Sequence, residues 1–277
     1  MGIEMVCCTD MGRIRKHNED CIGGNKSLGL VVLADGMGGY QAGEVASEMA
    51  VNIIMKELHT PFKTLPNVKH RTSHRYHAAT VRLEKAILKA NEAIYEKAEQ
   101  QVRYQGMGTT VVAVLFHNLM MSVAHVGDSR LYRLRGNEFS QITKDHSVRQ
   151  ELIDCGIYTP EQARHSPNKN LVTRALGVGE LVDVEIQEQR ILAQDIYLLC
   201  SDGLSDMLDD SDMHAIVQKA DTLEQAAQLL VEAANAKGGK DNISLILVRL
   251  LPAATKPRKG WLHQLFGHRQ NDFQTHP

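Results

Sequence analysis

LVVLADGMGG, at residues 30–39, runs a short apolar stretch directly into an acid and three glycines. The apolar residues 30–34 include two adjacent valines and predict a strand that is buried on both faces. The glycines can adopt positive φ angles and let a ligand approach the backbone, so we expect a tight turn at residues 35–39. Asp35 would then stand at the rigid end of a strand, where a carboxylate can hold a metal ion. Taken alone, the Asp-Gly pair favours an ordinary hairpin turn, so the rest of the chain must decide between the two interpretations.

Length and composition are typical of one soluble globular domain. The chain has 277 residues, of which 43% are hydrophobic and 23% charged, and its formal net charge is -2. That charge gives no bias toward nucleic acid or a membrane surface. No apolar run reaches the roughly 18 residues of a membrane span, and the N-terminus lacks a basic segment followed by an apolar run. We therefore expect a cytoplasmic protein with no nucleic-acid partner and no membrane span.

Hydrophobic periodicity divides the chain into strands and four long helices. Strands are expected at residues 4–9, 30–34, 111–116, 120–126, 131–134, 139–143, 184–187, 195–200 and 243–250, with a further strand beginning near Cys21. Helices are expected at residues 41–59, 80–103, 211–220 and 223–236. We interpret residues 1–251 as one domain and residues 252–277 as a basic, flexible tail. Two irregular segments, 60–79 and 145–177, interrupt the pattern, and the second is long enough to be a functional flap.

Acidic residues stand at the ends of several expected strands. They are Glu19, Asp20, Asp35, Asp128, Asp202 and Asp241. If these strand ends meet in one cleft, repulsion among the carboxylates is unfavourable unless cations bind between them. Oxygen ligands alone favour Mg²⁺ or Mn²⁺ over zinc or copper. Two such ions can share a water molecule, lower its pKa and direct it at a phosphoryl group.

The polar segment 9–20 places Arg15 shortly before Glu19 and Asp20. A guanidinium has the planar fork that suits phosphate oxygens, so Arg15 is a candidate phosphate-binding residue. An exposed loop with a local ion pair explains the same residues equally well. Both interpretations therefore stay open for this segment taken alone.

Zinc is the less favoured metal on the sequence. The five cysteines are an odd number without CxxC spacing, so they signal neither a disulfide framework nor a zinc site. His70, His74 and His77 in the basic segment have spacings that could ligate zinc. Because no cysteine or carboxylate stands in position to complete the set, a solvated loop is the favoured interpretation.

Eight motifs follow one another along nearly the whole chain. They read TDMGRIRKHNED, ADGMGG, GMGTT, AHVGDSRLYRL, TKDHS, LVTRALG, LLCSDGLSDML and KDNISLILV. In this order they resemble the metal-dependent PPM family of Ser/Thr phosphatases, protein phosphatase type 2C, in its bacterial branch. The resemblance implies an α+β fold of four layers, an α-β-β-α sandwich in which helix pairs flank two mostly antiparallel sheets. The metal site would lie at one end of the sandwich.

The resemblance also implies the ligands of two metal ions, Mn²⁺ or Mg²⁺. Asp35 matches the carboxylate that bridges both ions, and Gly36 matches the residue whose carbonyl binds one of them. Asp202 and Asp241 match the ligands of the other ion.

Further site residues are implied in the same way. Glu19 and Asp20 match acids that act on the metals directly or through water. Arg15 matches the phosphate-binding arginine and is, with Asp35, an expected catalytic residue. Asp128 and Asp202 match the site of a third, weaker ion.

The chain departs from the family pattern at two places. Many eukaryotic relatives carry a histidine, proposed as general acid, where this chain has Met37, which cannot donate a proton. His146 and His17 are weak substitutes, and metal-bound water is another candidate. In the flap the chain reads SPNKN at 166–170, where the family commonly has His-Pro-x-Arg-Asn. A substrate preference cannot therefore be carried over from relatives.

Our hypothesis from the sequence is a Mg²⁺- or Mn²⁺-dependent phosphatase of phosphoserine and phosphothreonine in proteins. Water bridging the two metals would attack directly, without a phosphoenzyme. By resemblance, the partners are phosphorylated proteins, namely a bacterial Ser/Thr kinase and its substrates, and we expect a monomer. The alternatives are a catalytically silent, phosphoprotein-binding regulatory module on the same fold, and a phosphatase of small molecules.

Overall fold

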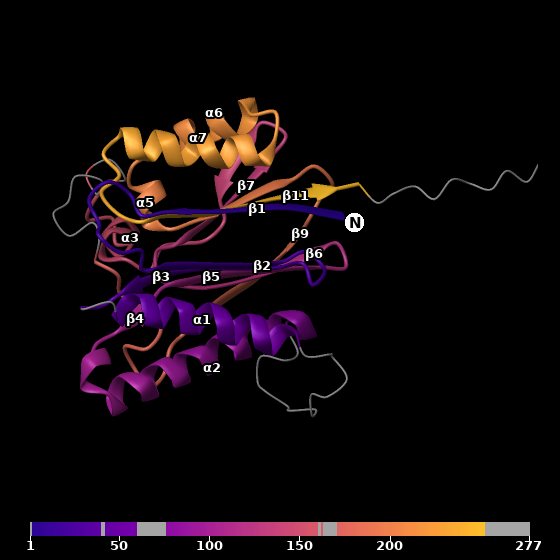
Figure 1. The fold of residues 1–277 in the computed structure, drawn as a ribbon. Helices are drawn as coiled ribbons and strands as arrows, with labels where there is room; N and C mark the ends of the chain where they lie inside the picture. Colours follow the sequence, from indigo (N-terminus) through magenta and orange to yellow (C-terminus); the bar gives the residue numbers. More distant parts are fainter. Residues whose placement is uncertain (1, 40–41, 60–75, 160–161, 163–170, 253–277) are drawn as a thin grey trace, which may run out of the picture.

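A computed structural model describes residues 2–39, 42–59, 76–159, 162 and 171–252. It shows four layers in the order helices, sheet, sheet, helices (Figure 1). The expected α+β sandwich is therefore confirmed. Most of the basic segment 60–79, the SPNKN stretch at 166–170 and the tail from residue 253 lie outside the described residues.

All the strands within each sheet are antiparallel. The first sheet has the order β1 (Gly2–Asp10), β11 (Ile243–Leu251), β10 (Ile196–Cys200), β7 (Arg130–Arg135) and β8 (Glu138–Gln141). The second has the order β2 (Asp20–Asn25), β3 (Leu30–Met37), β5 (Val111–His117), β6 (Met120–Val126) and β9 (Glu185–Arg190), and β4 (Gly108–Thr109) pairs with β3. The hydrophobic pattern of the sequence predicted most of these strands, but the observed ends differ from the predicted ones by a few residues.

Helix pairs cover the outer face of each sheet (Figure 1). The helices α1 (Ala42–His59) and α2 (Ala78–Gln100) pack on the second sheet, and α6 (Asp210–Lys219) and α7 (Leu223–Ala236) pack on the first. Shorter turns of helix are η2 (Val102–Tyr104), α3 (Val148–Asp154) and α5 (Asp202–Ser205). No helix in the described part of the chain is long and apolar enough to cross a lipid bilayer.

Strand β3 is buried on both faces, as its sequence predicts. Leu30 and Val32 pack among the buried side chains of the α1 and α2 layer. Val31 and Leu33 point the other way and pack between the two sheets. Because both faces bury apolar surface, the strand is held rigidly, and so is the acid that follows it.

The tight turn expected at residues 35–39 begins later than the sequence indicates. β3 continues through Asp35, because Gly36 pairs with Thr109 and Met37 pairs with Gly108. The positive φ that the turn requires occurs at Gly38, at 155°. Gly36 is needed for a different reason, since a Cβ there would lie 2.2 Å from the carbonyl oxygen of Gly43 in α1. The glycine allows the start of α1 to approach the strand closely.

Two further boundaries differ from expectation. The helix expected at 80–103 starts at Ala78 and ends at Gln100, because Gln101 takes an extended conformation with φ -133° and a separate turn of 3-10 helix follows. Val102 lies just beyond this end and is 88% exposed, so a longer helix would bury no apolar surface there. A second Asp-Gly pair follows β10, and there it begins the short helix α5 at Asp202.

Candidate active site

A hollow of about 260 Å³ opens at the end of the sandwich where several strands terminate. Its lining includes every expected site residue except Asp20: Arg15, Glu19, Asp35, Gly36, Asp128, Asp202 and Asp241. Asp20 lies next to this lining, because it pairs in register with Asp35 between β2 and β3. The structure thus brings together residues that are up to 226 positions apart in the chain.

Backbone hydrogen bonds hold Asp35 in place. Its carbonyl oxygen accepts from the Thr110 N–H and from the Thr109 hydroxyl, both at 2.8 Å. Its own N–H donates to Thr110 Oγ1 at 3.2 Å. Because these bonds fix the backbone of Asp35 on both sides, they limit the positions that its carboxylate can take.

Asp202 and Asp241 meet where α5 packs against the start of β11. Gly203 allows this contact, since a Cβ at that position would lie 1.9 Å from the carbonyl oxygen of Asn242. Asp241 Oδ1 accepts from the Asn242 N–H at 2.9 Å. The two carboxylates therefore face the hollow from two elements that close packing locks together.

The acids of this cluster strongly perturb one another. Burial, followed by the charge of Asp20, raises the pKa of Asp35 well above its usual range. Burial and the charge of Asp128 do the same to the pKa of Asp202. Burial raises the pKa of Asp20 to about 7, and burial with the charge of Asp145 raises that of Asp128 to about 6. The protein alone therefore cannot keep all of these groups ionised at neutral pH.

This set fits divalent cations. Asp20 Oδ1 is buried and has no hydrogen-bond partner within the described residues, while Ser201 Oγ donates to its Oδ2 at 2.9 Å. A cation gives such an orphaned oxygen a partner and relieves the repulsion among the carboxylates. The oxygen-only donor set suits Mg²⁺ or Mn²⁺.

Arg15 forms an ion pair, but not the local one that the sequence left open. Its Nη2 donates at 2.7 Å to Asp241 Oδ2, which lies 226 positions later in the chain. This hydrogen bond raises the pKa of the guanidinium. The side chain remains 51% exposed, which leaves donors of the planar fork free to meet an oxyanion at the mouth of the hollow.

Asn242 organises the site, and the sequence assigned it no role. Its Oδ1 accepts from the Glu19 N–H at 2.9 Å, and its Nδ2 donates to the carbonyl oxygens of Met11 and His17. One side chain thus ties the loop that carries Arg15 to the start of β11. The signal that could have revealed this role in the sequence is an asparagine that directly follows an acid at the start of a strand.

A buried ion network next to Asp128 was also missed. Arg130 donates from Nε and Nη2 to the Asp145 carboxylate, and Arg149 donates to it at 2.8 Å. Burial alone would raise the pKa of Asp145, but these two cations hold it below its usual range. The network anchors the start of the segment expected to be a flap.

The candidates for a general acid do not stand in the hollow. Met37 is part of the lining, but His146 and His17 are not. His146 is buried behind the site, and His17 is exposed on the loop after β1. From the described part of the expected flap, Val172 contributes to the lining.

The alternative zinc set is described only in part. His70 and His74 lie outside the described residues, and His77 Nδ1 lies 2.6 Å from Glu188 Oε2. This contact pairs His77 with a carboxylate of β9, far along the chain from the other two histidines.

The fold and the site define a class of protein. Two packed antiparallel sheets, each covered by a helix pair, present clustered carboxylates and an arginine at one end, an arrangement suited to an enzyme that acts on phosphate esters. Comparison with known proteins makes the class specific. Residues 15–238 match the family model described as Protein phosphatase 2C. The chain belongs to this family and is a phosphoprotein phosphatase of its bacterial Ser/Thr branch.

Relatives and solved structures agree with this assignment. The chain is 39% identical over 243 residues to serine/threonine phosphatase stp of Listeria innocua, covering 87% of this chain and 93% of the relative. The crystal structure of the Mycobacterium tuberculosis phosphatase PstP/Ppp matches with a TM-score of 0.81 at 34% identity, covering 91% of this chain and all of that one. A structure of the PstP catalytic domain in complex with two manganese ions matches with a TM-score of 0.78 at 33% identity, covering 91% of this chain and 99% of that one.

Proposed function

We propose that this enzyme hydrolyses phosphoserine and phosphothreonine in proteins by direct attack of water, with two divalent cations, Mn²⁺ or Mg²⁺, bound by the carboxylate cluster. The observation that carries the proposal is the crowding of the half-buried Asp35 and Asp202 among other acids, next to a half-exposed Arg15. The similar PstP structure with two manganese ions supports the number and kind of cations.

The proposed ligands are those that the family resemblance implies, and all of them but Asp20 line the hollow. Asp35 would lie between the two ions, Gly36 would bind through its carbonyl, Asp202 and Asp241 would bind one ion, Glu19 and Asp20 would act directly or through water, and Asp128 with Asp202 would hold a third, weaker ion. When bound, such ions lower the pKa of a shared water and neutralise charge on the phosphoryl group. The chain contributes the fixed carboxylates, and Arg15 orients the phosphate.

Proton transfer to the leaving group is a step for which the lining, as far as the described residues form it, contains no histidine. Met37 occupies the position after Asp-Gly and carries no titratable proton. The leaving serine or threonine oxygen is therefore expected to take its proton from water that enters the open hollow. We also propose that the enzyme acts in the cytoplasm as a monomer, with a Ser/Thr kinase and that kinase's substrates as its partners.

Hydrolysis of a phosphothreonine peptide and of a matched phosphotyrosine peptide tests the proposal. Each is measured with Mn²⁺, with Mg²⁺ and with chelator. Turnover that requires metal and favours phosphothreonine is the expected result, and a small aryl phosphate should be a poorer substrate than the phosphothreonine peptide. No turnover from a folded protein with either metal would contradict the proposal and favour a silent binding module. A trapped covalent phosphoenzyme would contradict direct attack.

Replacing Arg15 by alanine is expected to raise the KM for a phosphopeptide about tenfold or more while kcat changes little, because a guanidinium grips phosphate in both ground and transition states. Initial rates over a range of peptide concentrations measure the two constants. Arg13→Ala is the matched control, since Arg13 is an exposed arginine of the same loop that does not line the hollow. A loss confined to kcat would argue against this role for Arg15.

A further inference from the structure

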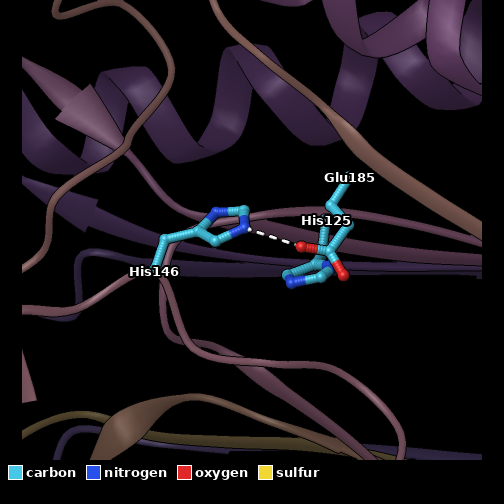
Figure 2. A group of neighbouring side chains, drawn as sticks. All are labelled: His125, His146 and Glu185. Carbon is cyan, nitrogen blue, oxygen red and sulfur yellow. Dashed lines mark hydrogen bonds and ion pairs between the residues drawn. The ribbon is translucent and has the colours of Figure 1, made fainter. Parts of the chain in front are cut away.

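A second group of titratable side chains lies behind the Asp128 turn. It consists of His125 at the end of β6, His146 two residues before α3, and Glu185 at the start of β9 (Figure 2). The ring nitrogen Nε2 of His146 lies 3.2 Å from Glu185 Oε2, and the His125 ring stacks on the His146 ring at 4.7 Å between centroids. Both histidines are buried.

The hydrogen bonds of this group oppose its use as a metal site, although each residue has one ligand atom within 4.8 Å of the others. The Gly127 N–H donates to His146 Nδ1 at 3.1 Å, so Nδ1 holds a lone pair and the proton of the neutral ring is on Nε2. A metal on Nε2 would need that proton to move to Nδ1, where it would face the Gly127 N–H. The nearly parallel rings, 18° apart, also cannot both point a lone pair at one ion without turning.

What His146 does in the structure is to hold the Gly127 turn from two sides. Its backbone N–H donates to the Gly127 carbonyl oxygen at 2.9 Å, while its ring accepts from the Gly127 N–H. Gly127 has φ +105°, and Asp128 is the next residue. Both backbone polar groups of Gly127, the residue before Asp128, are therefore bound by this histidine.

The same residue also holds the far wall of the hollow. The carbonyl oxygen of His146 accepts from the Thr173 N–H at 2.8 Å, and the next residue, Ser147, forms a β-bridge with Val172. Both Val172 and Asp128 line the hollow. His146 is thus a direct link between the wall formed by Val172 and the turn that carries Asp128.

The ring of His146 is kept in one orientation. Glu185 accepts the Nε2 proton on one side, which leaves Nδ1 as an acceptor for Gly127. The stacked His125 is itself fixed, since its Nε2 donates to the Lys144 carbonyl oxygen at 2.9 Å. Glu185 and His125 therefore select both the tautomer and the plane of the His146 ring.

We propose that His146 is a positioning residue for metal binding, which places Asp128 and Val172 around the hollow by acting as a hydrogen-bond acceptor at Nδ1. The inference rests on the proposed function, in which Asp128 binds the weakest of the metal ions. His146 touches neither substrate nor metal and acts through the Gly127 turn.

Two substitutions of the same residue test this role. In His146→Asn the side-chain oxygen stands close to the place of Nδ1 and can still accept from Gly127, whereas His146→Leu removes the acceptor and leaves a buried N–H unpaired. We expect His146→Leu to raise the Mn²⁺ concentration for half-maximal activity about tenfold and to weaken the last Mn²⁺ bound in a calorimetric titration by a similar factor. His146→Asn should stay within about threefold of the wild type on both measures.

The control is a buried substitution that breaks comparable hydrogen bonds elsewhere. Thr80 of α2 is fully buried, and its hydroxyl bonds Ser122 and Glu188 without contacting the hollow. Thr80→Val is expected to lower the urea midpoint but to leave the Mn²⁺ titration unchanged, which separates lost stability from lost positioning. If His146→Leu binds Mn²⁺ like the wild type, or if His146→Asn is as impaired as His146→Leu, the positioning role is wrong. A wild type that binds no Mn²⁺ by calorimetry would instead overturn the proposed function and this inference with it.

Discussion

Asp35→Asn is expected to lower metal-dependent hydrolysis of a phosphothreonine peptide by about a thousandfold or more, since it removes the charge that the proposal places between two cations. The amide keeps the size of the side chain and leaves untouched the backbone hydrogen bonds to Thr109 and Thr110. The variant should therefore fold. Steady-state rates with Mn²⁺ and with chelator, beside a circular dichroism spectrum, measure both parts of the prediction.

Stability in chelator gives this prediction a second readout. Burial and neighbouring acids raise the pKa of Asp35, so its ionised form opposes folding in the metal-free protein. Asp35→Asn should thus be at least as resistant to urea as the wild type at pH 8 without metal. Asp183→Asn is the matched control, because Asp183 is 86% exposed and outside the hollow. Undiminished turnover in Asp35→Asn would refute the bridging role of Asp35.

The sequence predicted well those features that depend on apolar burial. Residues 30–33 alternate between two apolar layers, and a strand with apolar side chains at every position has few other places in a soluble fold. The positions of the acids at the strand ends were predicted for a related reason. A charged residue that directly follows a buried apolar run marks the end of the strand. Arg15 was found as well, but its partner Asp241 lies 226 positions away, and local spacing carries no information about such a contact.

Features that depend on two backbone segments approaching each other closely could not be predicted from the hydrophobic pattern. A single glycine at position 36 reads as a turn, although it serves to let Gly43 approach β3. Asn242 and His146 act through hydrogen bonds to backbone groups that tertiary structure brings to them. Such bonds leave no periodic pattern in the sequence, so a motif can contain the residue without revealing its role.

Removal of divalent cations is expected to destabilise the protein most at alkaline pH. The pKa of Asp20 is about 7 in the folded chain, against about 3.9 when unfolded, so the folded state holds a proton that the unfolded state has lost between these values. The contribution of Asp20 to the stability of the metal-free protein is then present on the acidic side of pH 7 and is lost as pH rises through it. Asp35 and Asp202, whose pKa values are also raised, add in the same direction.

Other groups decide the pH range in which this effect should be measured. Burial lowers the pKa values of His117, His125 and His146, which weakens the fold as pH falls below about 6.5 and opposes the carboxylates there. Unfolded histidines are still half protonated at pH 6.5, so between pH 6.5 and 8.5 they oppose the acids, and the contribution of Asp20 is measured as a difference from Asp20→Asn. Urea denaturation in chelator at the two pH values should show the wild type losing on the order of 1 kcal/mol relative to this variant.

Cations should reverse this trend. Saturating Mn²⁺ binds the ionised carboxylates and stabilises the folded state by about 3 kcal/mol per site at a hundredfold excess over Kd, most strongly at pH 8.5 where protons no longer compete. Asp20→Asn should lose less stability than the wild type as pH rises in chelator, because the amide cannot ionise. A wild type that gains stability relative to Asp20→Asn as pH rises in chelator, or a pH dependence that Mn²⁺ leaves unchanged, would mean that the buried acids are held by partners within the protein rather than by metal.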